Sequence, residues 1–275
     1  MTGILAQLTP LTAYGNQCLR TNQLPAGFYP ENKAFQYCNT VNFWKVDGQN
    51  ELLVAIDPYF WFRYLQGEGC QALKLYYQPA KENPLAREHQ LTGFVGGGGT
   101  WLIEAIFAAH SDFWASRWQV TRKDDPDHRI WSVKYGRTSV NLATVNQQLD
   151  LAATANELYE SLGAIIEFTV QQNLASWTDF FQKAAQRLNS DTPEAGYYNE
   201  ALAPEGEYSL HPRQLLYTAG SAWAFGGMGS WNDLSFEKAE DNERYNNVSA
   251  RLYDAINRAI VAAVNGKPPA PVLNR

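Results

Sequence analysis

The sequence predicts an α+β fold: a mainly antiparallel sheet with a short helix in the N-terminal half, packed by long amphipathic helices from the C-terminal half. Up to about residue 145, β-prone runs alternate with Gly, Pro and Asn, and beyond it apolar residues recur every three or four positions. Aromatic residues make up 13% of the chain, enough for a substantial core. We expect a β-rich half at 1–145, a helical half at 146–266 and a loose tail at 267–275. No Pro- or Gly-rich linker marks the join, so the two halves should form one integrated unit.

Turn-forming residues dominate the start of the chain. Pro10, Gly15 and Pro25 interrupt the first forty residues, which we therefore expect to form loops and short pieces. The runs 41–46 and 52–56 flank Asp-Gly, a strong hairpin signal. Asp57-Pro58 follows, with a capping carboxylate and a proline suited to the first helical position. It predicts a short helix over 58–66.

Further strands are expected in the rest of this half. The runs 73–78 and 100–106 are β-prone, and 115–121 and 129–135 are joined by a polar turn containing Lys-Asp-Asp-Pro-Asp. Residues 130–135 alternate between small or polar and aromatic or β-branched side chains, the two-residue period of a strand. An antiparallel hairpin over 115–135 is therefore the clearest prediction in this half.

Helical periodicity dominates the second half. Apolar positions at helical spacing predict long helices over 151–173 and 244–264. Ser176-Trp177-Thr178-Asp179 resembles a capping box that restarts a helix, and His211 opens a shorter helix towards residue 222, after a surface loop at 189–209. The apolar faces of the two long helices need a cover, which could be each other, the sheet or another copy of the chain.

Composition excludes several classes of function. The formal net charge is −6 and no Lys/Arg cluster stands apart from acidic residues, so we expect no nucleic-acid partner. No uncharged apolar run approaches 18 residues, so we expect no membrane span. The start shows no export leader, and the three cysteines form no Cys-x-x-Cys pair, which predicts a cytoplasmic protein without a disulfide framework or zinc cluster. No cofactor signature is present, and none is expected.

Four consecutive glycines, Gly96–Gly99, stand in the stretch GFVGGGGTWLIEA at 93–105. A phosphate loop would need a lysine after them, and a dinucleotide fingerprint would need glycine at Trp101, so both motifs fail. We expect a bulge or a close approach of two backbones, with a mobile loop over a pocket as the alternative. A second glycine-rich loop, Gly226–Gly229, should pack its aromatic residues on the core. If the two loops instead frame a ligand, the candidate ligand-binding residues are Gly97, Gly98, Trp101, Trp223, Trp231 and Asp233.

Three polar residues in the first half are candidate catalytic groups. Glu104 interrupts the apolar run Trp-Leu-Ile-Glu-Ala-Ile, and it could pair with Arg117 or Arg129 or serve as a buried general acid or base. His110 and Asp112 are two residues apart, which on a strand places both side chains on one face. With His211, they would supply the two histidines and one carboxylate of a non-haem iron site. The intervening helices argue against that arrangement, and the expected metal is none.

Three hypotheses about function remain. The first is a non-catalytic protein that binds a protein partner through an aromatic or helical surface, with self-association through helices 151–173 and 244–264 as one form. The second is an enzyme or small-ligand binder with its site at Gly96–Gly99 and Gly226–Gly229. The third is a metal enzyme that uses His110, Asp112 and His211. The sequence resembles no family closely enough to choose among them.

Overall fold

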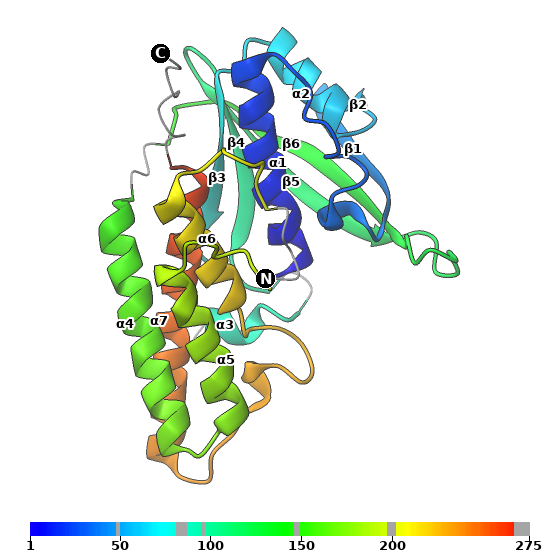
Figure 1. Cartoon of the computed structure of the whole chain (residues 1–275). Coiled ribbons are helices and arrows are strands. Elements are labelled where there is room, and N and C mark those ends of the chain that lie inside the picture. Colours follow the sequence, from blue (N-terminus) through cyan, green and yellow to red (C-terminus); the bar gives the residue numbers. More distant parts are fainter. Residues whose placement is uncertain (48–49, 81–86, 95–96, 146–148, 197–201, 267–275) are drawn as a thin grey trace, which may run out of the picture.

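The structure is a computed structural model, and it describes residues 1–47, 50–80, 87–94, 97–145, 149–196 and 202–266. In this part of the chain, a six-stranded sheet lies beside a group of helices (Figure 1). The strands are β1 Cys38–Asp47, β2 Asn50–Ala55, β3 Ala72–Gln78, β4 Thr100–Ile106, β5 Ser111–Val120 and β6 Trp131–Leu142. The α-helices are α1 Gly3–Thr21, α2 Pro58–Gly67, α3 Glu88–Leu91, α4 Leu151–Gln171, α5 Ala175–Gln186, α6 Leu210–Ser221 and α7 Ala239–Val264. The predicted α+β class is confirmed.

The sheet is mixed but mostly antiparallel, with the order β2-β1-β6-β5-β4-β3. Strands β3 to β6 form an antiparallel meander, and the β1–β2 hairpin joins it through a parallel pairing of β1 with β6. The predicted hairpin at 115–135 is confirmed and extends further at both ends. The two residues between β1 and β2, 48 and 49, lie outside the described part of the chain.

Helix α1 contradicts the loops expected for the first forty residues. Thr2 caps it by accepting a hydrogen bond from the Leu5 amide at 3.3 Å. Leu5, Leu8 and Leu11 are fully buried. Burying a leucine contributes about 2 kcal/mol, so three outweigh the roughly 3 kcal/mol that an internal Pro10 costs a helix. Tertiary packing therefore overrides the breaker residues, as α1 lies across one face of the sheet (Figure 1).

Helix α2 forms as its local sequence predicts. The Asp57 carboxylate accepts a hydrogen bond from the Phe60 amide at 2.9 Å, and Pro58 occupies the first turn. Its Trp61 ring stacks on Phe43 of β1 at a centroid distance of 4.4 Å, which fixes the helix over the β1–β2 edge of the sheet. Helix α2 ends at Gly67, and Glu68 is the residue that follows it.

Helices α4 and α7 cover each other's apolar faces. Leu158, Leu162 and Ile165 of α4 and Leu252 and Ile256 of α7 are fully buried, and the two helices pack against each other. Glu167, Glu160 and Glu157 pair with Arg244, Arg251 and Arg258 along the exposed side. The cover that the sequence required therefore comes from within the chain. Self-association through these helices stays a prediction.

Other boundaries differ from the predictions in smaller ways. Helix α5 begins at Ala175 after a cap residue that makes no side-chain hydrogen bond, so the expected capping box is wrong; Asp179 instead pairs with Lys183 at 2.6 Å. Helix α7 begins at Ala239, and part of the 189–209 stretch folds inward, because Tyr208 is buried and donates to the Val264 carbonyl at 3.0 Å.

Contacts also tie the two halves together. The Asn265 side chain, just after α7, bonds both the amide and the carbonyl of Leu75 in β3, each at 2.8 Å. The boundary near residue 145 itself stays a prediction, and the tail at 267–275 lies outside the described residues. Within the described part, no helix combines the length and the apolarity that a membrane crossing requires.

Candidate functional site

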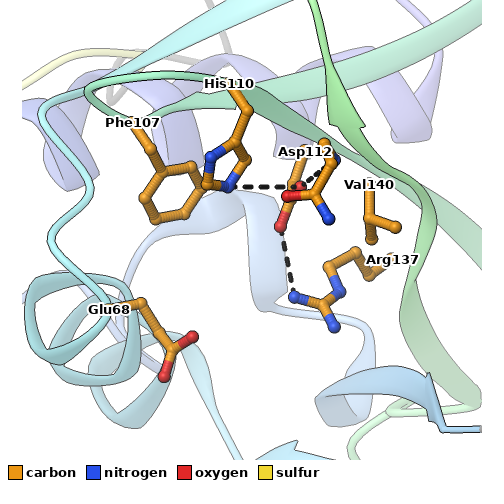
Figure 2. Close-up of a pocket in the computed structure, with 7 residues that line it drawn as sticks. Glu68, Phe107, His110, Asp112, Arg137 and Val140 are labelled. Atoms are coloured by element: carbon orange, nitrogen blue, oxygen red, sulfur yellow. Dashed lines mark hydrogen bonds and ion pairs between the residues drawn. The ribbon is translucent and has the colours of Figure 1, made fainter.

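A cavity of about 270 Å³ opens where the end of α2 meets the β4–β5 turn and the last residues of β6 (Figure 2). It is lined by polar and charged side chains of both signs, with two apolar ones. The lining residues are Glu68, Phe107, His110, Asp112, Arg137, Val140 and Asn141. The cavity contains His110 and Asp112, two of the three catalytic candidates that the sequence indicated.

The β4–β5 turn places the aromatic part of the wall. The Phe107 amide donates to the His110 carbonyl at 2.8 Å, which closes the turn around two alanines. As a result the His110 imidazole stacks on the Phe107 ring at a centroid distance of 4.7 Å and an interplanar angle of 13°. The imidazole side chain remains 34% exposed, so its ring edge can contact a ligand in the cavity.

Asp112 is the buried centre of the site. Its side chain is only 5% exposed, and its Oδ2 accepts a hydrogen bond from Arg137 Nη1 at 3.1 Å. The Asn141 backbone amide donates to Oδ1 at 3.0 Å. His110 Nε2 lies 3.8 Å from the same Oδ1, too long for a hydrogen bond but close enough for electrostatic attraction to an imidazolium. A buried carboxylate needs such partners, because an unpaired charge is costly away from water.

Arg137 is brought to this position by the regular register of β5 and β6, and Asn141 by the irregular pairing beyond it. Ser111 pairs with Leu142, Phe113 with Ser139 and Trp114 with Arg137, so β6 carries extra residues on both sides of Phe113. Asn141 has the left-handed φ of 55° that such an irregularity uses. Bulges often re-aim side chains beside functional sites. Here the irregular pairing allows Asn141 to contact Asp112 in addition to Arg137.

Two buried polar groups beside the cavity have no hydrogen-bond partner among the described residues. They are Arg137 Nε and the Tyr64 hydroxyl. Burial raises the pKa of Tyr64, and the charges of Glu68, Arg137 and Asp112 also act on it, which places the hydroxyl near this cluster. Unsatisfied buried groups are rare in native proteins and usually bond to water or to a ligand.

The chemistry available here is reversible binding and proton transfer. Arg137, Asn141 and the imidazole offer donors, and the two carboxylates offer acceptors. None of the described lining residues is a serine, threonine, cysteine or lysine, so the wall offers no hydroxyl, thiol or amine nucleophile, only carboxylates and an imidazole. An imidazole beside a carboxylate is suited to general acid–base work, which also requires a substrate within reach.

The third metal ligand proposed from the sequence does not join this site. His211 is an exposed residue near the start of α6. In the described part of the chain, no group of three or more His, Cys, Asp or Glu side chains could hold a metal ion. The structure thus brings His110 and Asp112 together without assembling the triad that a non-haem iron site would need.

Gly93, at the start of the first glycine-rich stretch, meets Gly226 of the second loop, whereas Gly97, Gly98 and Gly99 contact other parts of the chain, and the space beside these glycines is filled. A Cβ on Gly93 would lie 2.3 Å from the Gly226 carbonyl oxygen, and one on Gly97 would lie 2.0 Å from the Leu91 carbonyl oxygen. Gly98, with a φ of +78°, lies against Thr92 and Tyr253, and Gly99 lies against the backbone and ring of β3. The predicted close approach of backbones is confirmed for 97–99, while Gly96 lies outside the described residues.

The aromatic candidates near these segments pack into the core. Trp231 is fully buried and its Nε1 donates to Ser249 Oγ at 2.7 Å. Trp223 is 9% exposed and donates to the Phe225 carbonyl at 2.7 Å, while Trp101 is equally buried and its ring lies against Tyr77. Asp233 accepts from the Gly229 amide within its own loop. Packing on the core, which the sequence favoured for this loop, is what these residues do.

Glu104 also has a structural partner, though not the one expected. It is 1% exposed and accepts a hydrogen bond from the Val145 amide at 2.9 Å. Arg129 pairs with Asp127 in its own turn instead, at 2.7 Å. Glu104 pairs in register with Phe113 and Ala105 with Asp112, so Glu104 and Asp112 lie on opposite faces of the sheet. Glu104 therefore does not contribute to the cavity.

Sequence reasoning missed Glu68, Phe107, Arg137 and Asn141. A usable signal existed for Arg137, because extending the predicted 115–135 hairpin in register places residue 137 near Asp112. The contribution of Glu68 depends on how α2 docks on the sheet, which no local pattern reports.

Comparison with family models, curated proteins and solved structures found no significant match to this chain.

Proposed function

We propose that this protein binds a small polar molecule in the cavity formed by Glu68, His110, Asp112, Arg137 and Asn141. The observation that carries the proposal is Arg137, which lines the cavity with 19% of its side chain exposed and whose side chain bonds only Asp112 among the described residues. A guanidinium has five N–H donors, and only its Nη1 is seen to bond Asp112. A ligand acceptor would satisfy a donor that the folded chain leaves unmatched.

The size of the cavity limits the ligand. Pockets for drug-sized molecules span about 300–1,000 Å³, and this one is about 270 Å³. Burial of Asp112 and the stacked Phe107–His110 pair hold the wall in place before a ligand arrives, which lowers the entropy lost on binding. This assignment differs from the glycine-loop site predicted from the sequence, because the glycine segments are filled by their own backbones.

The proposal is tested by screening a library of small polar metabolites against the full chain by NMR, with the His110 imidazole signal as the reporter. We expect at least one compound to shift that signal, and the Arg137→Lys variant, which keeps the charge but lacks Nε, to bind it about tenfold more weakly. Arg129→Lys, in an exposed ion pair, is the matched control. Ligands that bind Arg137→Lys as well as wild type would contradict the proposal, as would a library that leaves His110 unmoved.

A second candidate function is recognition of a protein partner, the first hypothesis drawn from the sequence. The favouring observation is a group of apolar residues on the sheet face opposite α1, Trp44, Val46 and Leu53, which lie beside the Lys134–Glu51 ion pair. Val46 is 60% exposed and Leu53 45% exposed, and β2 is an edge strand with a free hydrogen-bonding side. Free edges accept an added strand, and exposed apolar residues beside them supply affinity.

This second candidate predicts a specific loss. A partner held by this group of apolar residues should bind wild type and be lost from a Val46→Lys, Leu53→Lys double variant, measured as the affinity of the isolated pair. The same partner bound equally by both proteins would exclude this surface. Both candidates keep the cytoplasmic location predicted from the sequence, which the free thiols of Cys18, Cys38 and Cys70 support.

A further inference from the structure

Charges of opposite sign face each other across the cavity. In Figure 2, Glu68 at the end of α2 stands on one wall, and the paired Arg137 and Asp112 stand on the other. We infer that the ligand is a small zwitterion that carries an ammonium and a carboxylate group close together, as a free α-amino acid does. This inference rests on the proposed binding function and names the chemical class of its ligand.

The carboxylate of the ligand would bind at Arg137. The guanidinium donates Nη1 to Asp112, and its side chain, 19% exposed, lines the cavity. Because the fork of N–H groups on arginine matches two carboxylate oxygens, a ligand carboxylate can pair with the guanidinium donors that Asp112 does not use, in charge-assisted bonds.

The ammonium of the ligand would bind between Glu68 and Asp112. Glu68 is exposed, and among the described residues it makes no ion pair and no side-chain hydrogen bond, so its carboxylate is open to a cation. Asp112 Oδ1 accepts one hydrogen bond, from the Asn141 amide, and a carboxylate oxygen has a second lone pair to offer. An ammonium has three donors, and the carboxylate of Glu68 and the remaining lone pair of Asp112 are the acceptors that the wall offers it.

The presence of both signs of charge on the wall favours a zwitterion over other polar ligands. Apart from the imidazole, the wall has two carboxylates and one guanidinium. A purely anionic ligand would add repulsion from both carboxylates, and a purely cationic one would leave the guanidinium donors that Asp112 does not use without an acceptor. A neutral sugar could hydrogen-bond to these groups but would leave the charge of Glu68 without a counterion. Val140 and the Phe107 ring form an apolar patch for an aliphatic side chain.

The inference is tested by calorimetric titration of the full chain with the free amino acids, and then with two derivatives of the one that binds best. The N-acetyl derivative lacks the ammonium, and the methyl ester lacks the carboxylate. We expect the parent to bind and each derivative to bind at least about tenfold more weakly. Glu68→Gln should weaken the binding of the parent and of the ester but not that of the N-acetyl derivative. Arg137→Lys should weaken the binding of the parent and of the N-acetyl derivative but not that of the ester.

Because Glu68 is exposed, Glu68→Gln should fold and keeps the test decisive even if Arg137→Lys unfolds. Its matched control is Glu51→Gln, which changes an exposed glutamate on β2. A derivative that binds as well as the parent overturns the zwitterion. So does a cavity that takes a metabolite from the library but no amino acid, in which case the proposed binding function still stands. If neither the library nor the amino acids bind, both proposals fall.

Discussion

Two regions that the sequence indicates as candidate sites are packed in opposite ways. The glycine-rich segments around Gly93 and Gly226 meet backbone to backbone, and aromatic rings close the space around them. The cavity at His110 and Asp112, by contrast, is open and lined by charges. Small residues can mark a site that admits a ligand, but here they mark a site that admits another part of the chain. The cavity instead lies beside the irregular pairing of β6 with β5, where side chains of opposite charge lie together.

The two regions also hold their histidines differently. His89, beside the glycine segments, is 1% exposed and its Nε2 has no partner among the described residues, while its ring lies 5.8 Å from that of Phe225. His110 is 34% exposed and stacked on a single ring. The same residue type is therefore part of the core in one region and part of a binding wall in the other. The following four predictions compare the regions, from the largest effect to the smallest.

The closest backbone contact should tolerate no side chain. Gly93→Ala would place Cβ 2.3 Å from the Gly226 carbonyl oxygen, and backbone atoms cannot move away as a flexible side chain would. We expect the free energy of unfolding, measured in urea, to fall by about 3 kcal/mol.

Gly163→Ala, on an exposed part of α4 with no atom within 4 Å of the added Cβ, is its control and should stabilise the helix by up to about 1 kcal/mol. Equal stability of the two variants would mean that the glycine segments do not meet.

Acid should weaken the closed region through His89. Burial lowers the pKa of His89 from 6.5 to about 4, with a smaller contribution from the charge of Arg87. As pH falls below 6.5 the unfolded chain takes up a proton that the folded chain refuses, so stability is present at neutral pH and is lost down to about pH 4. The full loss from this group is up to about 3 kcal/mol.

The measurement is unfolding in urea from pH 7 to pH 4 for wild type and His89→Phe. The variant should lose less stability on acidification than wild type does, whereas His128→Gln, in an exposed turn, should follow wild type. Parallel curves for wild type and His89→Phe would show that this imidazole is not buried in the folded state.

The charge pair of the open region should matter less than either. Asp112→Asn keeps the shape of the side chain and the bond from the Asn141 amide but leaves Arg137 without its carboxylate. Breaking a fully buried pair costs about 3–5 kcal/mol, and the Arg137 side chain is 19% exposed, so we expect a loss of about 2 kcal/mol.

Asp127→Asn removes the carboxylate from an exposed pair and should change stability by less than about 1 kcal/mol. A cost for Asp112→Asn no larger than that of this control would place the pair in solvent.

His110 should contribute least to stability. His110→Gln removes a partly exposed ring that, in the described part of the chain, stacks on Phe107 and approaches Asp112 at 3.8 Å, so stability should change by no more than about 0.5 kcal/mol. Thermal unfolding measures this directly, and a loss comparable with that of Gly93→Ala would mean that the open region is packed like the closed one.

Signals within a few residues of each other predicted much of the fold. The Asp57-Pro58 start of α2, the 115–135 hairpin and the apolar faces of α4 and α7 are local patterns, and each element forms as they indicate. Helix α1 was missed because its Pro10 and Gly15 are breakers in isolation. Gly15 is required because a Cβ there would lie 2.4 Å from the Leu73 side chain, a contact between residues far apart in the sequence.

Two of the seven residues that line the candidate site were also predictable. His110 and Asp112 stand two residues apart and were chosen for their chemistry, while Glu104, equally suggestive in the sequence, faces the other side of the sheet. Asn141 reaches Asp112 because β6 contains extra residues at its pairing with β5, and the position of such irregularities is set by the folded sheet. Local patterns therefore identify the reactive residue types but not which of them meet.

The parallel pairing of β1 with β6 joins residues nearly a hundred positions apart, such as Cys38 and Trp131. Closing so long a loop is entropically demanding, so the β1–β6 pairing should form late, after the local hairpins on each side of it. Glu68 follows the β1–β2 hairpin, whereas His110 and Arg137 belong to the meander, so the two walls of the cavity come from the two parts of the sheet that this pairing joins. A ligand that contacts both walls would hold these two parts together and would slow unfolding in proportion to its occupancy.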